Sequence, residues 1–252
     1  MFDLSGCVAI VTGGNGGIGL GMARGLARAG ARVVVAARNE QKSSAAVREL
    51  KALGSDAFAL TVDVTDEAAV QSMVDTAAQR CGRIDILVNN AGINIRKPAH
   101  ELPLAQWKEV IETNLTSAFI CSRAVYPHLK RGGGGKIVNI GSMLSIFGAS
   151  FAPAYGASKG GLVQLTKSLA VAWAGDNIQV NAVLPGWIDT DLTKKAREQL
   201  EGLHERVLAR TPAARWGAAG DFEGVAVFLS SAASDFVTGT AIPVDGGYST
   251  QV

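Results

Sequence analysis

Short apolar runs alternate with longer helical stretches along almost the whole chain, and this alternation limits the fold more than any other feature. Strand-like runs occupy residues 7–11, 31–37, 57–62, 84–88, 136–140, 178–183 and 241–244. Helix-like stretches end near 29 and occupy 40–53, 66–81, 104–111, 115–129, 155–174 and 222–229, with a charged amphipathic segment at 192–209. Such spacing forms βαβ units with a parallel sheet and right-handed crossovers. We therefore expect an α/β fold.

Length and charge narrow the class of protein further. The chain has 252 residues with 48% hydrophobic residues, enough for one large core, and no linker-like stretch divides it. The formal net charge of +2 gives no basic face, so neither nucleic acid nor an anionic membrane is expected as a partner. The uncharged stretch 137–158 contains Asn139 and Pro153, which do not suit a membrane-spanning helix.

The cysteines and the N-terminus indicate the cellular compartment in which the protein works. Cys7, Cys81 and Cys121 are odd in number and widely spaced, which predicts neither disulfides nor a zinc site and fits a reducing compartment. The histidines are scattered, so no metal site is expected. The N-terminus has no basic region followed by an apolar run, as a signal peptide would have. We expect a cytoplasmic protein.

A glycine-rich segment, Thr12-Gly-Gly-Asn-Gly-Gly-Ile-Gly19, joins the first strand run to the first helical stretch. Backbone N–H groups and the positive end of a helix can bind a pyrophosphate at such a junction. The glycines fit two spacings, one using positions 14, 16 and 19 and the other positions 13, 17 and 19. So many glycines cost conformational entropy with little structural return, which favours a ligand-binding turn over an empty one.

Tyr155 and Lys159 lie four residues apart in a helical stretch, so their side chains project from the same face. A free phenol has a pKa of ~10, and a nearby ammonium lowers it by favouring the phenolate. Such a pair can exchange protons near neutrality. Taken alone, the spacing more often means a solvated lysine beside a half-buried tyrosine.

Taken together, the motifs resemble the short-chain dehydrogenase/reductase family. They are T-G-x-x-x-G-x-G at 12–19, N-N-A-G at 89–92, Ser142, Y-x-x-x-K at 155–159 and P-G at 185–186, in the family's order across nearly the whole chain. The resemblance implies a single-domain Rossmann fold over residues 1–252, with a seven-stranded parallel sheet and helices on both faces. The cofactor-binding part would cover about 1–140, and the catalytic helix and substrate lid about 141–252. A nicotinamide cofactor, a reversible alcohol–carbonyl reaction on a small molecule and a homotetramer are also implied.

The resemblance implies a catalytic tetrad of Asn114, Ser142, Tyr155 and Lys159. Tyr155 would exchange a proton with the substrate oxygen, while Lys159 would lower its pKa and hold the nicotinamide ribose. Ser142 would hydrogen-bond the substrate oxygen, and Asn114 would position a water that relays protons to Lys159. Singly, Asn114 and Ser142 are more simply helix-cap and strand-end residues; the full set in order favours catalysis.

The same resemblance selects the second glycine spacing and assigns a wider set of cofactor contacts. In chain order they are Gly13, Asn15, Gly17, Ile18, Gly19, Arg38, Asp63, Val64, Asn90, Ala91, Gly92, Tyr155, Lys159, Pro185, Gly186, Ile188 and Thr190. Asp63 stands where the family contacts adenine, and Thr190 where it contacts the nicotinamide carboxamide. A turn-capping role is the alternative for Asp63.

The second strand run decides the choice of cofactor. NAD-binding sites place an acid at the end of this strand, where it accepts a hydrogen bond from the ribose 2′-hydroxyl. Here Ala37 occupies that place and Arg38 follows. A guanidinium suits a 2′-phosphate, so we predict NADP(H) in preference to NAD(H). NAD(H) stays open, because a turn could bring Glu40 back and Arg38 could simply be solvated.

Within the family, residues 141–145, 211–217 and 234–239 look most like gluconate-type and 2-keto-3-deoxygluconate dehydrogenases. Arg96 could pair with a sugar-acid carboxylate or be solvated. A stripe of Leu192, Ala196, Leu200, Leu203 and Val207 could cover the active site or pack onto the core. A 3-oxoacyl-thioester reductase is the alternative enzyme, and a non-catalytic cofactor-binding regulator is the alternative of a different class.

Overall fold

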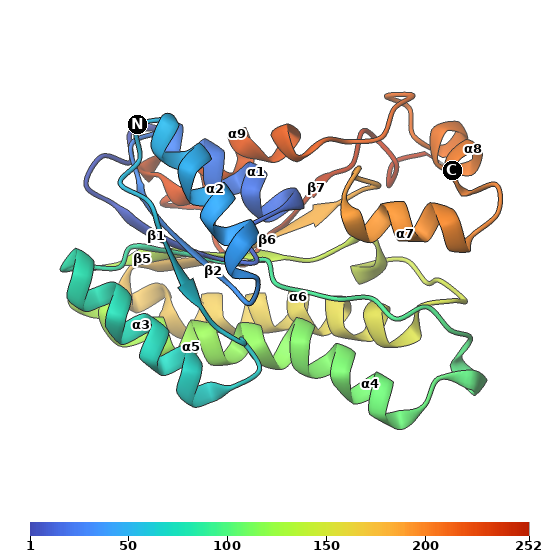
Figure 1. Ribbon diagram of the computed structural model, residues 1–252, viewed down its shortest axis with the longest axis horizontal. Helices are drawn as coiled ribbons and strands as arrows, with labels where there is room; N and C mark the ends of the chain where they lie inside the picture. Colours follow the sequence, from blue (N-terminus) through green and yellow to red (C-terminus); the bar gives the residue numbers. More distant parts are fainter. Residues whose placement is uncertain (252) are drawn as a thin grey trace.

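The computed structural model describes residues 1–251 and shows a parallel sheet between two layers of helices (Figure 1). The strands are β1 (Val8–Thr12), β2 (Arg32–Ala37), β3 (Phe58–Thr61), β4 (Ile86–Asn89), β5 (Gly135–Ile140), β6 (Ile178–Pro185) and β7 (Ala241–Val244). Over the described residues they form one seven-stranded sheet in the order β3-β2-β1-β4-β5-β6-β7, with every neighbouring pair parallel. The Rossmann-type sheet is thereby confirmed.

The α-helices are α1 (Gly17–Arg28), α2 (Glu40–Ala52), α3 (Glu67–Cys81), α4 (Leu104–Ile111), α5 (Ser117–Arg131), α6 (Pro153–Trp173), α7 (Asp191–Gln199), α8 (Leu203–Arg210) and α9 (Glu223–Ser230). Helices α1, α2 and α9 cover one face of the sheet, and α3 to α6 cover the other (Figure 1). Helices α7 and α8 lie together at one end of the molecule (Figure 1). Within residues 1–251, no helix is both long and apolar enough to cross a membrane.

The sheet is buried on both faces because its strands are apolar at successive positions. In β1, Val8 and Ile10 belong to the core on the α3–α6 side, while Ala9 and Val11 belong to the core under α1 and α9. Since successive side chains of a strand point to opposite faces, an unbroken apolar run fills both cores. The helices therefore have fixed layers on either side, and the strand ends are left free to carry the site.

Two predicted boundaries are wrong, and the rest agree to within a residue or two. The helices predicted at 104–111 and 115–129 are not separate, because a π-helical turn, Glu112–Thr116, joins α4 to α5. The single amphipathic segment predicted at 192–209 is two helices, interrupted at Gly202 with a left-handed φ of 65°. Glycine adopts this conformation at little steric cost, which allows α8 to turn away from α7.

The contact of α1 with α9 and with the 3-10 turn that precedes α9 (Ala219–Phe222) depends on glycines in α1. A Cβ placed on Gly21 would lie 2.0 Å from the carbonyl oxygen of Ala219, and one on Gly25 would lie 2.5 Å from that of Glu223. Backbone thus packs against backbone at this contact. Because α1 begins at the glycine-rich turn, its position fixes the position of that turn.

This contact gives a stability prediction. Gly21→Ala should lower the free energy of unfolding by ~1–3 kcal/mol, because the overlap outweighs alanine's helix preference. Gly224→Ala in α9 is the matched control: its Cβ would meet no atom within 4 Å, so it should stabilise by about 0.5–1 kcal/mol. Urea denaturation of the three proteins measures both effects. A Gly21→Ala protein as stable as the parent would contradict the packing argument.

Candidate active site

Side chains of Thr12 and Asn90 join the carboxyl ends of β1 and β4. The Thr12 hydroxyl accepts hydrogen bonds from the backbone N–H groups of Asn90 (3.0 Å) and Ala91 (3.1 Å). The Asn90 amide donates in return to the carbonyl oxygens of Thr12 (3.0 Å) and Gly13 (3.1 Å). The loop after β4 is therefore held directly against the glycine-rich turn.

The glycine-rich turn is packed on one side and open on the other. Gly13 and Gly17 have left-handed φ values of 64° and 51°. A Cβ on Gly13 or Gly19 would lie 2.8 Å or 2.3 Å from the Asn90 amide nitrogen, whereas one on Gly16 would meet no atom within 4 Å. Gly13, Gly17 and Gly19 are therefore all constrained, as the second spacing requires, and of the first spacing Gly16 is free while a Cβ on Gly14 would lie 2.9 Å from Val11 O. The open side leaves backbone N–H groups accessible to a phosphate.

Two adjoining cavities form a groove along this edge of the sheet. The first, of about 340 Å³, brings together Gly13, Asn15, Gly17, Ile18, Asn90, Ala91, Gly92, Ser142, Tyr155, Lys159, Pro185, Gly186, Ile188 and Thr190. The second, of about 280 Å³, is lined by Gly13, Asn15, Arg38, Asp63, Val64, Ala91 and Gly92. Of the residues singled out from the sequence, Gly19 and Asn114 line neither cavity: Gly19 packs against Asn90, and Asn114 lies behind Gly92.

The end of the groove at β2 is cationic. Arg38 is largely exposed, with Nη1 3.6 Å from Asp63 Oδ2. Asp63 accepts hydrogen bonds from Thr65 N (3.0 Å) and Thr65 Oγ1 (2.7 Å), and these bonds hold the pKa of Asp63 below its usual value. Glu40 does not turn back into the groove, since its Oε1 accepts from Thr61 Oγ1 at 3.3 Å. The alternative in which Glu40 binds the ribose has no support in this geometry.

Lys42 is a groove residue that the sequence reasoning missed. It lines both cavities, and its Nζ lies 2.9 Å from Asp191 Oδ2, so it links the first turn of α2 to the first residue of α7. The hydrogen bond from Lys42 lowers the pKa of Asp191. The signal available in the sequence was a second basic residue soon after Arg38. Thr193, also missed, lines the groove from α7 beside Leu192, which the sequence analysis placed in the apolar stripe.

Tyr155 and Lys159 project from α6 toward the end of β5. The Lys159 amine is buried and donates a 2.6 Å hydrogen bond to the carbonyl oxygen of Ile140. It lies 5.6 Å from the centre of the Tyr155 ring. Burial lowers the pKa of Lys159 to about 8, because desolvation disfavours the ammonium form.

The Tyr155 phenol does not show the lowered pKa expected from a neighbouring amine. Burial raises the pKa of Tyr155, opposed by a hydrogen bond with the Ser142 hydroxyl and by the charge of Arg96. Lys159 is not among the groups that shift this pKa, because its amine is directed at Ile140 O, so the predicted lowering by Lys159 stays a prediction. Arg96 and Ser142 are the groups that favour the phenolate here.

Asn114 lies in the π-helical turn between α4 and α5 and is buried. Its amide accepts from Ile93 N (2.8 Å) and donates to Ile93 O (2.9 Å) and Ser158 Oγ (3.0 Å). A Cβ on Gly92 would lie 3.2 Å from Asn114 Oδ1 and 3.6 Å from Lys159 Nζ. Gly92 therefore lets the amide and the amine approach each other, and π-helical turns of this kind are frequent at functional sites.

A further cavity of about 460 Å³ opens beside Ser142 and Tyr155 and is closed from above by α7 and α8. Leu192, Leu203 and Val207 line it, whereas Ala196 and Leu200 pack with Trp187 and Trp216 into a small core belonging to these two helices. The predicted apolar stripe therefore has both roles, and Leu203 and Val207 belong to the cavity wall and to this core at once.

Arg96 extends into the same cavity from the loop after β4. Its Nη1 donates to Gln199 Oε1 at 3.2 Å and its Nη2 to Leu192 O at 3.3 Å. Its Nε is buried without a hydrogen-bond partner among the described residues, and burial lowers the pKa of its guanidinium. A buried donor on a cation without a carboxylate partner is costly unless an anionic ligand binds there.

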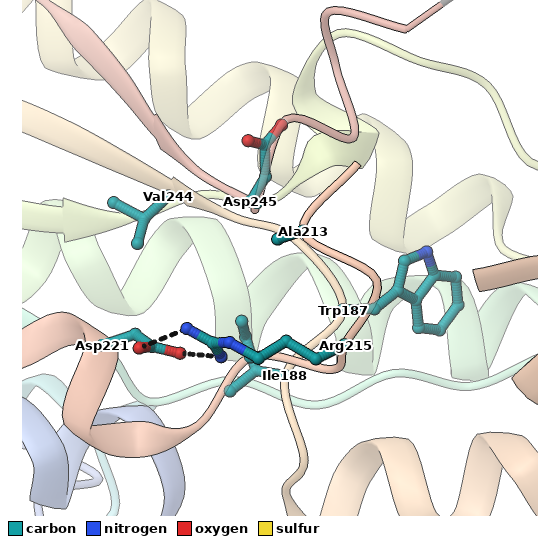
Figure 2. A pocket seen from close by; sticks show the side chains of 9 residues that line it. Trp187, Ile188, Ala213, Arg215, Asp221, Val244 and Asp245 are labelled. Atoms are coloured by element: carbon teal, nitrogen blue, oxygen red, sulfur yellow. Dashed lines mark hydrogen bonds and ion pairs between the residues drawn. The ribbon is translucent and has the colours of Figure 1, made fainter. Parts of the chain in front are cut away.

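The segment that carries α7 and α8, here called the lid, leaves the sheet and returns at one place. Gly217 N donates to Trp187 O at 2.9 Å, and Asp189 N donates to Gly217 O at 2.8 Å. A separate cavity of about 270 Å³ adjoins this neck; there Arg215 pairs with Asp221, and the Trp187 ring points away from both (Figure 2). No member of the predicted tetrad lines that cavity.

A glycine turn open to a phosphate, a groove across the carboxyl edge of a parallel sheet and a Tyr–Lys pair at its end define a nicotinamide-dependent oxidoreductase of the Rossmann type. A family model described as enoyl-(acyl carrier protein) reductase matches residues 13–249. The chain belongs to the short-chain dehydrogenase/reductase family, as the resemblance of its motifs predicted.

Two relatives and one solved structure show where in the family the chain lies. It is 43% identical to the 2-dehydro-3-deoxy-D-gluconate 5-dehydrogenase of Formosa agariphila, covering 98% of this chain and 94% of the relative. It is 41% identical to the gluconate 5-dehydrogenase of Gluconobacter oxydans, covering 98% and 96%. The crystal structure of a gluconate 5-dehydrogenase from Burkholderia cenocepacia in complex with NADP and tartrate matches with a TM-score of 0.94 at 40% identity, covering 100% of this chain and 98% of that one.

The buried amine of Lys159 gives a pH prediction. Its pKa is about 8 when folded and 10.5 ordinarily, so between these values the unfolded chain holds a proton that the folded chain has lost. Stability rises with pH wherever the unfolded state binds more protons. The unfolding free energy of the parent minus that of Lys159→Met should therefore rise by ~3 kcal/mol across this window. Urea denaturation of cofactor-free protein at several pH values measures it, and parallel pH profiles would contradict it.

Proposed function

We propose that the protein is an NADP(H)-dependent oxidoreductase that interconverts a secondary alcohol and a ketone on a sugar acid of the gluconate type. The observation that carries this proposal is the Arg96 guanidinium, buried at Nε without a partner in the cavity that Ser142 and Tyr155 also line. A carboxylate is the anion whose geometry a guanidinium matches best in two parallel hydrogen bonds. A sugar acid supplies that carboxylate together with a nearby secondary hydroxyl.

The relatives support the sugar-acid assignment over the alternatives. Those compared above act on gluconate or 2-dehydro-3-deoxy-D-gluconate, and the Burkholderia enzyme was crystallised with tartrate, a small hydroxy acid. Neither relative is named as a 3-oxoacyl-thioester reductase. A non-catalytic regulator has no need of Ser142, Tyr155 and Lys159 gathered in one cavity.

The chemistry follows from the positions of the side chains. Bound NADP⁺ supplies the acceptor for the hydride that leaves the carbinol carbon, and NADPH supplies the hydride in the reverse direction. During oxidation the Tyr155 oxygen takes the hydroxyl proton as the C=O bond forms, and during reduction it returns that proton. Ser142 holds the substrate oxygen beside Tyr155, and Arg96 holds the carboxylate, which limits the substrate to one orientation.

The cavity-lining residues at β2 support NADP(H). Arg38 borders the second cavity of the groove, the end of β2 carries Ala37 instead of an acid, and Glu40 is turned toward Thr61. Lys42 adds a second cation between the two cavities. These charges suit a 2′-phosphate, and the Burkholderia structure contains NADP.

We propose in addition a single domain over residues 1–252, with a cofactor-binding part to about 140, a homotetrameric assembly and a cytoplasmic location. Exposed apolar side chains on the α4–α6 layer support association between copies: Leu104 is 66%, Phe119 42% and Val171 84% exposed. The three cysteines are unpaired thiols, which fits a reducing compartment.

The substrate assignment predicts a selective effect of Arg96→Gln. Losing a charged hydrogen bond costs ~1.5–3 kcal/mol, so kcat/KM for gluconate or its 5-keto product should fall about 10- to 150-fold, mainly through KM. Turnover of an uncharged ketone should fall much less, because it makes no bond to the guanidinium and loses only the effect of the Arg96 charge on Tyr155. Tyr155→Phe, in contrast, should slow both substrates by ~10²–10⁴. Absence of turnover with every sugar acid would defeat the proposed function, and equal losses on both substrates would defeat the role of Arg96.

The cofactor assignment predicts that Arg38→Ala weakens NADPH binding about 10-fold or more and leaves NADH binding unchanged, because only NADPH carries the 2′-phosphate. Titration of each cofactor, followed by nicotinamide fluorescence, gives both dissociation constants. Arg48→Ala is the matched control, since Arg48 is an exposed arginine of α2 outside the groove. An unaltered affinity of Arg38→Ala for NADPH would refute the assignment.

A further inference from the structure

The substrate cavity contains more positive charge than one carboxylate requires. Three arginines line it, Arg96, Arg206 and Arg210, and its lining includes no aspartate or glutamate. A cleft lined by charges of one sign concentrates ligands of the opposite sign. A single carboxylate on Arg96 leaves the other two guanidinium groups unmatched.

The two additional arginines belong to one face of α8. Leu203, Arg206, Val207 and Arg210 follow helical spacing, and all four line the cavity. Leu203 and Val207 are buried in the core of the lid, which sets the orientation of that face. Like charges four residues apart destabilise an isolated helix, so the arrangement has a cost that packing does not explain.

The arginines of the lid differ according to whether they line the cavity. Arg197 pairs with Asp189, and Arg215 with Asp221, and neither lines the substrate cavity. Arg206 and Arg210 line it, and neither forms an ion pair with a carboxylate in the described residues. Among these four arginines of the lid, only the two outside the cavity are therefore neutralised by a carboxylate.

Arg210 is held in place without using its hydrogen-bond donors. Its Cζ lies 4.4 Å from the ring centre of Tyr248 and 5.1 Å from that of Phe147. Cation–π contacts with two rings restrict the guanidinium between the C-terminal segment and the loop after β5. Its N–H groups stay available to an anion. Arg96 instead contacts α7 through Gln199 Oε1 and Leu192 O, so the α8 pair belongs to another part of the cavity.

We propose that Arg206 and Arg210 form a second anion-binding subsite, and that the preferred substrate carries a second acidic group at the end remote from the carboxylate held by Arg96. The inference rests on the proposed function, because it assigns the same cavity to a sugar acid. A second carboxylate and a phosphate ester share the chemistry that two guanidinium groups recognise. The subsite therefore selects a doubly acidic sugar derivative over a simple aldonate.

Three six-carbon substrates that differ at one end test the proposal. D-Gluconate, D-glucarate and 6-phospho-D-gluconate share a carboxylate at carbon 1 and carry a hydroxymethyl, a carboxylate or a phosphate ester at the other end. The parent enzyme with NADP⁺ should oxidise at least one of the doubly acidic compounds with a kcat/KM about 10-fold or more above that for gluconate. The identity of the preferred compound distinguishes carboxylate from phosphate.

Arg206→Gln, Arg210→Gln and the double variant should lose this preference, through a KM that rises about 10-fold or more for the doubly acidic compounds and much less for gluconate. The substitutions should not disturb folding, because both side chains are exposed and glutamine has a helix propensity close to that of arginine. Thermal unfolding of each variant verifies this. Arg197→Gln, a lid arginine outside the cavity, should keep the preference. The Arg210→Lys variant keeps the positive charge and should therefore retain part of the preference for the doubly acidic compounds.

Two results would overturn the second subsite while leaving the proposed function intact. One is a parent enzyme that oxidises gluconate as well as or better than both doubly acidic compounds. The other is a double variant that loses activity equally on all three, as a purely structural defect would produce. If none of the three is oxidised, the proposed function itself fails and the subsite fails with it.

Discussion

The site depends on hydrogen bonds between side-chain amides and the carboxyl ends of neighbouring strands. Asn90 binds the carbonyl groups of Thr12 and Gly13, and Asn89 donates to Asn139 at 2.9 Å, which donates to Thr166 on α6 at 2.9 Å. A buried amide is costly without partners, so these bonds favour one arrangement of β1, β4, β5 and α6, although Asn89 Oδ1 itself has no partner among the described residues. The glycine turn and the catalytic helix consequently have fixed positions relative to each other before any ligand binds.

Burial acts in opposite directions on the two central groups of the site. Burial raises the pKa of the Tyr155 phenol and lowers the pKa of the Lys159 amine to about 8. As the pH rises, the amine therefore loses its proton before the phenol does. The charge of Arg96 and the hydroxyl of Ser142 oppose the effect on Tyr155. Arg96, the group proposed to hold the substrate's carboxylate, therefore also favours the ionised form of Tyr155.

Much of the fold and the centre of the site could be predicted from the sequence, because both depend on local patterns. Apolar runs fixed the strands, and the left-handed conformations of Gly13 and Gly17 follow from their place in the turn. Lys42, Arg206 and Arg210 could not be found this way, since each reaches its cavity only through the placement of α2 or α8. The break at Gly202 was missed because charged residues on both sides continue a helical pattern. That the Lys159 amine donates to Ile140 O could not be predicted from spacing along a helix.

The neck at Trp187, Asp189 and Gly217 makes the lid structurally independent of the sheet. The segment departs and rejoins within a few ångströms, and it carries its own small core of Ala196, Leu203 and Val207. Substitutions within the lid therefore need not disturb the sheet, provided that the two backbone hydrogen bonds at the neck are kept. Grafting the segment between related enzymes would therefore transfer substrate preference together with the part of the dinucleotide groove that Thr190, Leu192 and Thr193 line.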